Sequence, residues 1–230
     1  DELIRKWNNV MLVTMSVTSR RYNEFIRMCR IVNKNGIKMI GLKGCILRNI
    51  YPVPELRTMG DFDVLVDSKS MKDITKIFKD NGYEIINDAF GIICKNSIAY
   101  WEIFDTMEEE FRIRPDKYDE LFLNNCISKN DATFPEYTYF FAHMIVHMGK
   151  HYIREGAGIR NLCDAALFIK KYKDNIDFNK AREICNEQNY SNIYSYIINT
   201  VNKWYGIDIS GINNIEEKDC DLFMEYTLLN

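Results

Sequence analysis

The chain has 230 residues, of which 47% are hydrophobic and 27% charged, and this is the composition of an ordinary globular protein with one large domain or two small ones. The formal net charge of −3 argues against nucleic acid as a partner, because phosphate binding depends on clustered Lys and Arg. No apolar run reaches the roughly 18 residues of a membrane span, no signal peptide opens the chain, and the cysteines are scattered without Cys-x-x-Cys spacing. We therefore expect a cytoplasmic protein with reduced thiols and no membrane partner.

Helices and strands alternate in the first half of the chain. Apolar residues at helical spacing predict helix over residues 2–34, and Asn35-Gly36 ends it. The other elements expected in this half are strands at 38–40, 61–66, 83–86, 91–95 and 98–104 and helices at 44–50 and 71–79. This order predicts an α+β fold, a small mixed β-sheet with flanking helices.

The second half of the chain is predicted to be helical, with no strand after about residue 117. Helical patterns cover residues 118–125, 136–152, 161–172, 179–188 and 192–205. The polar stretch at 128–131, which precedes Pro135, is the expected boundary. We therefore expect an α+β domain at 1–130 and an all-helical C-terminal domain at 131–230.

Two aspartates, Asp61 and Asp63, stand one residue apart at the start of an apolar strand. Side chains on a strand alternate between its faces, so both carboxylates point to the same side. A third acid, Glu102, lies on the strand predicted at 98–104, with Asp105 and Glu108 as nearby rivals for its place. Such carboxylates suit Mg²⁺, which takes one or two of them together with substrate phosphates. The alternative is that they are solvated residues at exposed strand ends.

Residues 41–44 are predicted to form a turn from a strand into a helix. Its glycines, Gly41 and Gly44, permit close approach of the backbone to a phosphate, and the start of a helix adds N–H donors. Lys43 within the turn either contacts phosphate or is solvated. Arg57 either pairs with a triphosphate oxygen or forms a salt bridge with a neighbouring acidic residue.

Three segments together resemble a known family: Leu42-Lys43-Gly44, Tyr51-Pro52-Val53-Pro54-Glu55-Leu56-Arg57 and Asp61-Phe62-Asp63. They resemble the nucleotidyltransferase superfamily with the polymerase-β-type fold, and within it an uncharacterised bacterial branch. The resemblance implies a Mg²⁺-dependent enzyme, with one or two ions and an NTP such as ATP as co-substrate. The NMP group would pass to a hydroxyl or other nucleophile of a small-molecule or protein acceptor, with release of pyrophosphate.

The same resemblance implies roles for particular residues. The metal-binding and catalytic residues would be Asp61, Asp63 and Glu102, and Glu102 would draw the proton from the acceptor hydroxyl. The nucleotide would be bound by Gly41, Lys43, Gly44 and Arg57. The other possibility is a catalytically silent member that binds a nucleotide or a partner protein.

Three histidines provide a competing signal. His143, His147 and His151 fall on one face of the helix predicted at 136–152. His-x-x-x-His on a helix can bind Zn²⁺, which would indicate a histidine-based metal phosphohydrolase. Alternatively, this face packs on the adjacent helix.

The bacterial branch carries a similar His-rich helix followed by Arg-x-x-x-Asp, which Arg160 and Asp164 match. The resemblance implies that His147, Arg160 and Asp164 form a wall of the active cleft and face the acceptor or the base. The alternative for Arg160 and Asp164 is a buried pair that stabilises the helix. The acidic run at 108–110 is expected to be a solvated charge run.

Overall fold

The computed structural model describes residues 2–154 and 158–209. They fall into two compact units, each of which is described by itself. The first unit holds the residues up to Met107 together with Asp116–Pro135, and the second holds Glu108–Pro115 and the residues from Glu136 onward. Within the described ranges, no helix is both long and apolar enough to cross a membrane.

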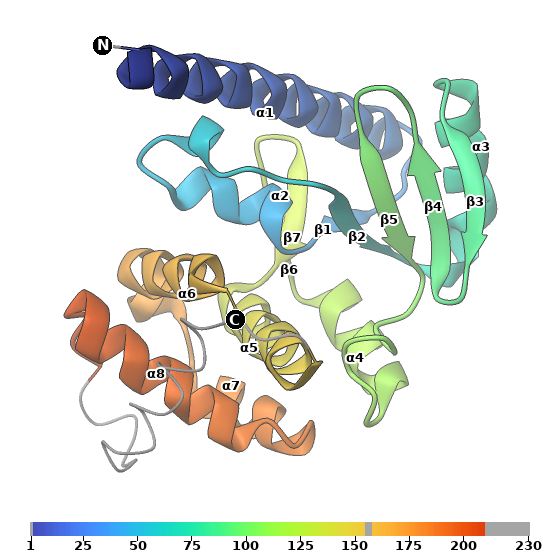
Figure 1. Ribbon diagram of the computed structural model, residues 1–230. Helices are drawn as coiled ribbons and strands as arrows, with labels where there is room; N and C mark the ends of the chain where they lie inside the picture. Colours follow the sequence, from blue (N-terminus) through green and yellow to red (C-terminus); the bar gives the residue numbers. More distant parts are fainter. Residues whose placement is uncertain (1, 155–157, 210–230) are drawn as a thin grey trace. The chain divides into compact units, whose positions relative to one another are not determined.

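The described residues of the first unit are built on a seven-stranded sheet of order β3-β4-β5-β2-β1-β7-β6 (Figure 1). Its strands are β1 Met39–Gly41, β2 Phe62–Val66, β3 Glu84–Asp88, β4 Gly91–Lys95, β5 Tyr100–Phe104, β6 Cys126–Lys129 and β7 Ala132–Pro135. β2 runs parallel to β5 and β1 parallel to β7, whereas the other pairs are antiparallel. The expected α+β fold with a mixed sheet is confirmed.

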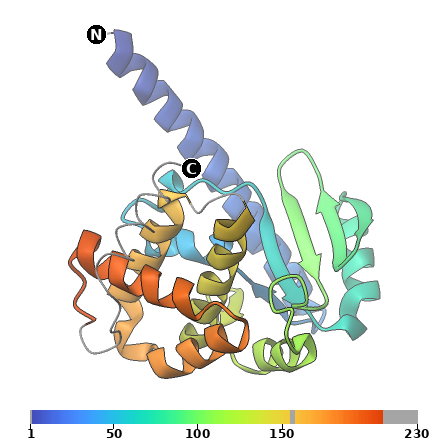
Figure 2. The same cartoon turned by 60° about the horizontal axis from the view of Figure 1, so that its bottom comes forward.

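Four helices flank this sheet along the described chain: α1 Glu2–Lys34, α2 Gly44–Leu47, α3 Met71–Asp80 and α4 Pro115–Asn124. Short 3₁₀ turns lie at Arg48–Ile50, Pro54–Leu56 and Ser68–Ser70. α1 is one continuous helix and ends where Gly36 adopts a φ of 75°, which glycine reaches without a steric penalty. α1 and α3 pack on the same face of the sheet, as both views show (Figures 1 and 2).

An aromatic core lies between these two helices and the sheet. Phe25 of α1 stacks on Trp101 of β5 with ring centroids 5.5 Å apart, and Phe78 of α3 meets the same indole edge-on at 5.2 Å. Phe62 of β2 lies 4.7 Å from Trp101, and all four side chains are buried. Since residues on a strand alternate between faces, this packing directs Asp63 and Glu102 to the opposite face of the sheet.

The expectation that strands end before residue 117 is wrong, because β6 and β7 form an antiparallel hairpin at the edge of the sheet. Its two-residue loop is Asn130-Asp131, and both residues have positive φ, 51° and 66°. Such a loop matches the twist of the flanking strands. Within the polar stretch that indicated a domain boundary, Asn130 and Asp131 therefore form a hairpin turn. The strand that follows this turn, β7, extends the sheet past residue 130. The expected division into domains at that residue stays a prediction.

The second unit is helical in the described residues from Glu136 onward, whereas residues 108–114 are turns and loop. Its helices are α5 Tyr137–Arg154, α6 Ile159–Tyr172, α7 Phe178–Glu187 and α8 Ser191–Tyr205, with a 3₁₀ turn at Lys173–Asn175 (Figure 1). Phe141 of α5 lies at the centre of its core, in ring contact with Phe168, Phe178 and Tyr194. The helical C-terminal part expected from the sequence is confirmed.

Candidate active site

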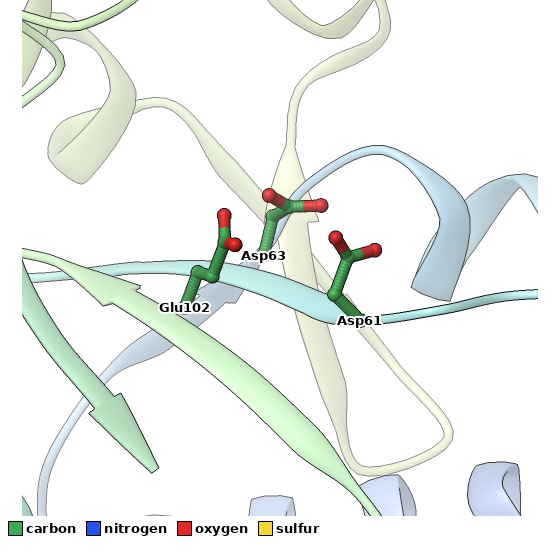
Figure 3. Close-up of side chains that lie close together, drawn as sticks. All are labelled: Asp61, Asp63 and Glu102. Atoms are coloured by element: carbon green, nitrogen blue, oxygen red, sulfur yellow. The ribbon is translucent and has the colours of Figure 1, made fainter. Parts of the chain in front are cut away.

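Three acidic side chains gather in the first unit, on the face of the sheet opposite α1 and α3. Asp61 immediately precedes β2, Asp63 lies within it, and Glu102 lies on β5. Each offers a carboxylate oxygen within 4.8 Å of the others. Figure 3 shows the three carboxylates pointing to the same side of the two strands. In the described part of the chain, this is the one group of three or more acidic, His or Cys side chains close enough to share an ion.

The register of two parallel strands creates this proximity. Asp63 is directly opposite Glu102, because Phe62 pairs with Trp101 and Val64 with Ile103. The buried partners on either side fix the two acids at the distance between neighbouring strands. The backbone N–H of Leu42 also donates to the Asp63 carbonyl at 2.9 Å, and this ties the 41–44 turn to the same strand.

The three acids differ in their environment. Asp63 is 4% exposed, Glu102 is half-buried, and Asp61 is exposed. The negative charge of the cluster reaches Tyr100, whose pKa is raised by desolvation and by the charges of Glu102 and Asp61. A cation is therefore favoured electrostatically at this position, and water or a ligand can reach it from the side of Asp61.

The positive charge of Lys43 offsets part of the negative charge of this cluster. Its Nζ lies 2.8 Å from Oδ1 of Asp63, and both side chains are largely shielded from solvent. The residue has φ 47° and ψ −125°, a conformation that glycine adopts freely and that costs another residue about 1–3 kcal/mol. The sequence left open whether Lys43 is solvated or binds phosphate, and neither alternative anticipated this ion pair with Asp63.

Gly44 and Arg57 also lie together in the first unit. Arg57 is 7% exposed, and its Nη1 donates to the Gly44 carbonyl at 3.4 Å. A Cβ on Gly44 would come within 2.7 Å of that nitrogen, so glycine lets the guanidinium reach the turn. Gly41 at the end of β1 is similarly confined, because its Cβ would lie 3.0 Å from Sγ of Cys45. Gly41, Lys43 and Gly44, which are predicted to bind nucleotide, therefore form one turn, and Arg57 contacts it. Their role in binding stays a prediction.

The other predicted residues belong to the second unit. Arg160 is exposed at the start of α6, and Asp164 is buried one turn later. Nδ1 of His147, a residue of α5, lies 3.0 Å from Oε1 of Glu110. Their expected place beside the nucleotide stays a prediction.

The sequence predicts a solvated charge run at 108–110, but part of this run is buried and paired. Glu110 is 8% exposed and binds both His147 and Lys150, whose Nζ lies 3.1 Å from it. Lys150 also binds Glu109 at 2.8 Å. Spacing in the sequence gave no signal for this network, because its acids and its bases are about forty residues apart.

A mixed sheet with paired carboxylates beside a glycine-containing turn is what the sequence resemblance to nucleotidyltransferases implied. A family model described as "Uncharacterised nucleotidyltransferase" matches residues 1–206, and the chain belongs to this family of transferase-type enzymes. No curated protein sequence matches the chain.

Solved structures share the fold at low sequence identity. An antigenic nucleotidyltransferase-like protein from Paracoccidioides brasiliensis has a TM-score of 0.55 and 14% identity, over 92% of this chain and 94% of that one. The antibiotic-resistance factor ANT(2'')-Ia in solution has a TM-score of 0.51 and 8% identity, over 82% and 97%. ANT(2'')-Ia in complex with adenylyl-2''-tobramycin has a TM-score of 0.53 and 9% identity, over 75% and 98%.

Proposed function

We propose that the protein is a Mg²⁺-dependent nucleotidyltransferase that transfers an NMP group from an NTP to a hydroxyl or other nucleophile of a small-molecule or protein acceptor. The observation that carries this proposal is the group formed by Asp61, Asp63 and Glu102, whose oxygens approach within 4.8 Å on one face of the sheet. The family supports the reaction class.

The donor set fits Mg²⁺. All three side chains supply hard carboxylate oxygens, and the exposed Asp61 leaves an approach for a phosphate-bearing ligand. Asp61 and Asp63 would hold the ion, with Glu102 completing the set. Bound there, Mg²⁺ would neutralise charge on the triphosphate and orient it.

The protein's own groups then have defined tasks. The acceptor oxygen attacks the α-phosphorus, the bond between that phosphorus and the bridging oxygen of pyrophosphate breaks, and pyrophosphate leaves. A carboxylate of the cluster, which we assign to Glu102, accepts the proton released by the acceptor hydroxyl. Lys43 and Arg57 would contact phosphate oxygens beside the Gly44 turn.

The acceptor is proposed to be a small molecule or a protein side chain rather than a nucleic acid. A duplex-binding protein typically neutralises roughly 6–10 phosphates with Lys and Arg, whereas this chain has a net charge of −3. ANT(2'')-Ia, with which the chain shares only the fold, was solved in complex with an adenylylated small molecule, adenylyl-2''-tobramycin, and this supports the same class of acceptor here.

The test is label transfer from each of the four NTPs, α-³²P-labelled, with Mg²⁺, to a metabolite extract, total protein, tRNA and short DNA. We expect label on a metabolite or protein, and its loss in Asp61→Asn and Asp63→Asn. Glu102→Gln should lower turnover by about 10²-fold or more, in line with loss of a general base. Glu84→Gln is the matched control, because Glu84 is an exposed acid on β3.

Three outcomes would contradict the proposal. Salt-sensitive transfer chiefly to RNA or DNA would overturn the assignment of the acceptor. NTP and Mg²⁺ binding without transfer to any acceptor would favour a silent nucleotide-binding module, and binding that survives in Asp61→Asn/Asp63→Asn would refute the site.

A further inference from the structure

Lys43 combines a strained backbone with a buried ion pair at the acidic cluster. The turn around it contains glycines, yet the position with φ 47° and ψ −125° holds a lysine. Strain of this kind persists where the side chain has a function that the surrounding structure enforces. The ammonium of this lysine donates to Oδ1 of Asp63, at 2.8 Å.

That contact is made to a carboxylate which the proposed metal would also use. The Lys43 side chain is 20% exposed and that of Asp63 6%, so water screens their attraction only weakly. A divalent ion among Asp61, Asp63 and Glu102 would be only a few ångströms from the ammonium and would be repelled by it. Metal and Lys43 therefore compete for the charge of Asp63.

We propose that Lys43 acts as a resident cation at Asp63 and exchanges that carboxylate for the triphosphate when metal and nucleotide bind together. The inference rests on the proposed function. A triphosphate gives the ammonium a new anionic partner, so nucleotide removes the repulsion that opposes the metal. The affinities of the two ligands are then coupled, and each must strengthen the other by the same factor.

The experiment measures Mn²⁺ binding to the full chain by electron paramagnetic resonance, with and without the α,β-methylene analogues of ATP, GTP, CTP and UTP. In the unaltered protein, an analogue should tighten Mn²⁺ binding about tenfold or more, a typical coupling between sites. Lys43→Met should bind Mn²⁺ alone about tenfold more tightly, because one nearby positive charge is gone. It should also bind the analogue more weakly and lose most of the coupling.

Three further variants separate charge from backbone effects. Lys43→Gly removes the ammonium and relieves the strained φ, so it should behave like Lys43→Met toward Mn²⁺ while unfolding at a higher urea concentration than Lys43→Met. Lys43→Arg keeps the charge and should keep weak binding of Mn²⁺ alone. Lys6→Met removes an exposed charge that pairs with Glu2 at 2.8 Å on α1, and it should leave Mn²⁺ affinity unchanged.

The results distinguish the inference from the function beneath it. If Asp63→Asn weakens Mn²⁺ binding but Lys43→Met leaves both its affinity and its coupling as in the unaltered protein, the resident-cation inference fails and the site survives. If Asp63→Asn leaves Mn²⁺ binding unchanged, or no analogue binds, the proposed site and the inference fall together.

Discussion

Gly91, the first residue of β4, allows a very close approach of β4 to β5, the strand that carries Glu102. A Cβ at this position would lie 1.9 Å from the Ile103 carbonyl oxygen, whereas ordinary contacts start at 3.4 Å. The obstacle is backbone of β5, which cannot move aside as a flexible side chain can. Gly91→Ala should therefore force β4 away from β5 next to Glu102, the predicted third acid.

The size of the effect follows from two losses. Overpacking against rigid structure costs about 1–3 kcal/mol, and each ladder hydrogen bond opened by the displacement adds about 1 kcal/mol. We expect the free energy of unfolding of the first unit to fall by about 3 kcal/mol or more. Gly82→Ala, with φ 82° but open space around it, should cost only about 1–2 kcal/mol. Gly60→Ala, with open space and no positive φ, should lie within about 0.5 kcal/mol of the unaltered protein.

The assay is urea unfolding followed by the fluorescence of Trp101, which is fully buried on β5. Trp7 and Trp204 are replaced by Phe in every variant so that only the first unit reports. The Gly91 variant should also bind Mn²⁺ more weakly, because β5 carries Glu102. If Gly91→Ala and Gly60→Ala had equal free energies of unfolding, the close contact between β4 and β5 at Gly91 would be refuted.

Two other predictions concern titration and reactivity. Hydrogen bonds from Arg27, and then from Tyr83, lower the pKa of Glu24 from 4.5, so its stabilising contribution is present above pH 4.5 and is lost as pH falls through the lower folded value. Glu24→Gln should flatten that acid limb in urea titrations between pH 3 and 7, and an unchanged limb would refute the coupling. Burial raises the pKa of the Cys94 thiol to about 12, so mass spectrometry after iodoacetamide at pH 8 should find half-buried Cys126 alkylated well before Cys94. The difference should vanish in urea, and equal native rates would contradict it.

Local signals in the sequence predicted most of the secondary structure. Helical spacing and Asn35-Gly36 located α1 and its end, and the strands expected at 91–95 and 98–104 match β4 and β5. The hairpin of β6 and β7 escaped because its strands have only four residues each and little alternation. Its Asn130-Asp131 loop has the same polar composition as a linker, and only the positive φ of both residues distinguishes the two.

The site was only partly predictable for a different reason. Asp61 and Asp63 share a face through the two-residue period of a strand, which is a local rule. Their approach to Glu102 depends on parallel pairing of β2 with β5, and α3, β3 and β4 intervene between these strands in the chain. Such pairing is set by tertiary packing. The ion pair of Lys43 with Asp63 depends in the same way on the pairing of β1 with β2. Neither the approach of Asp63 to Glu102 nor that of Lys43 to Asp63 can be read from the spacing of these residues in the sequence.

The acidic cluster and the aromatic core are two consequences of one alternation along β2 and β5. Carboxylates this close repel one another, so a flexible chain would let them separate. Phe62 and Trp101 resist that separation, because they are buried against α1 and α3 on the other face. Lys43 offsets part of the charge, and solvent reaches Asp61. The protein can thus hold like charges in place without a cation, and the proposed binding of a metal with a nucleotide would use this preorganisation.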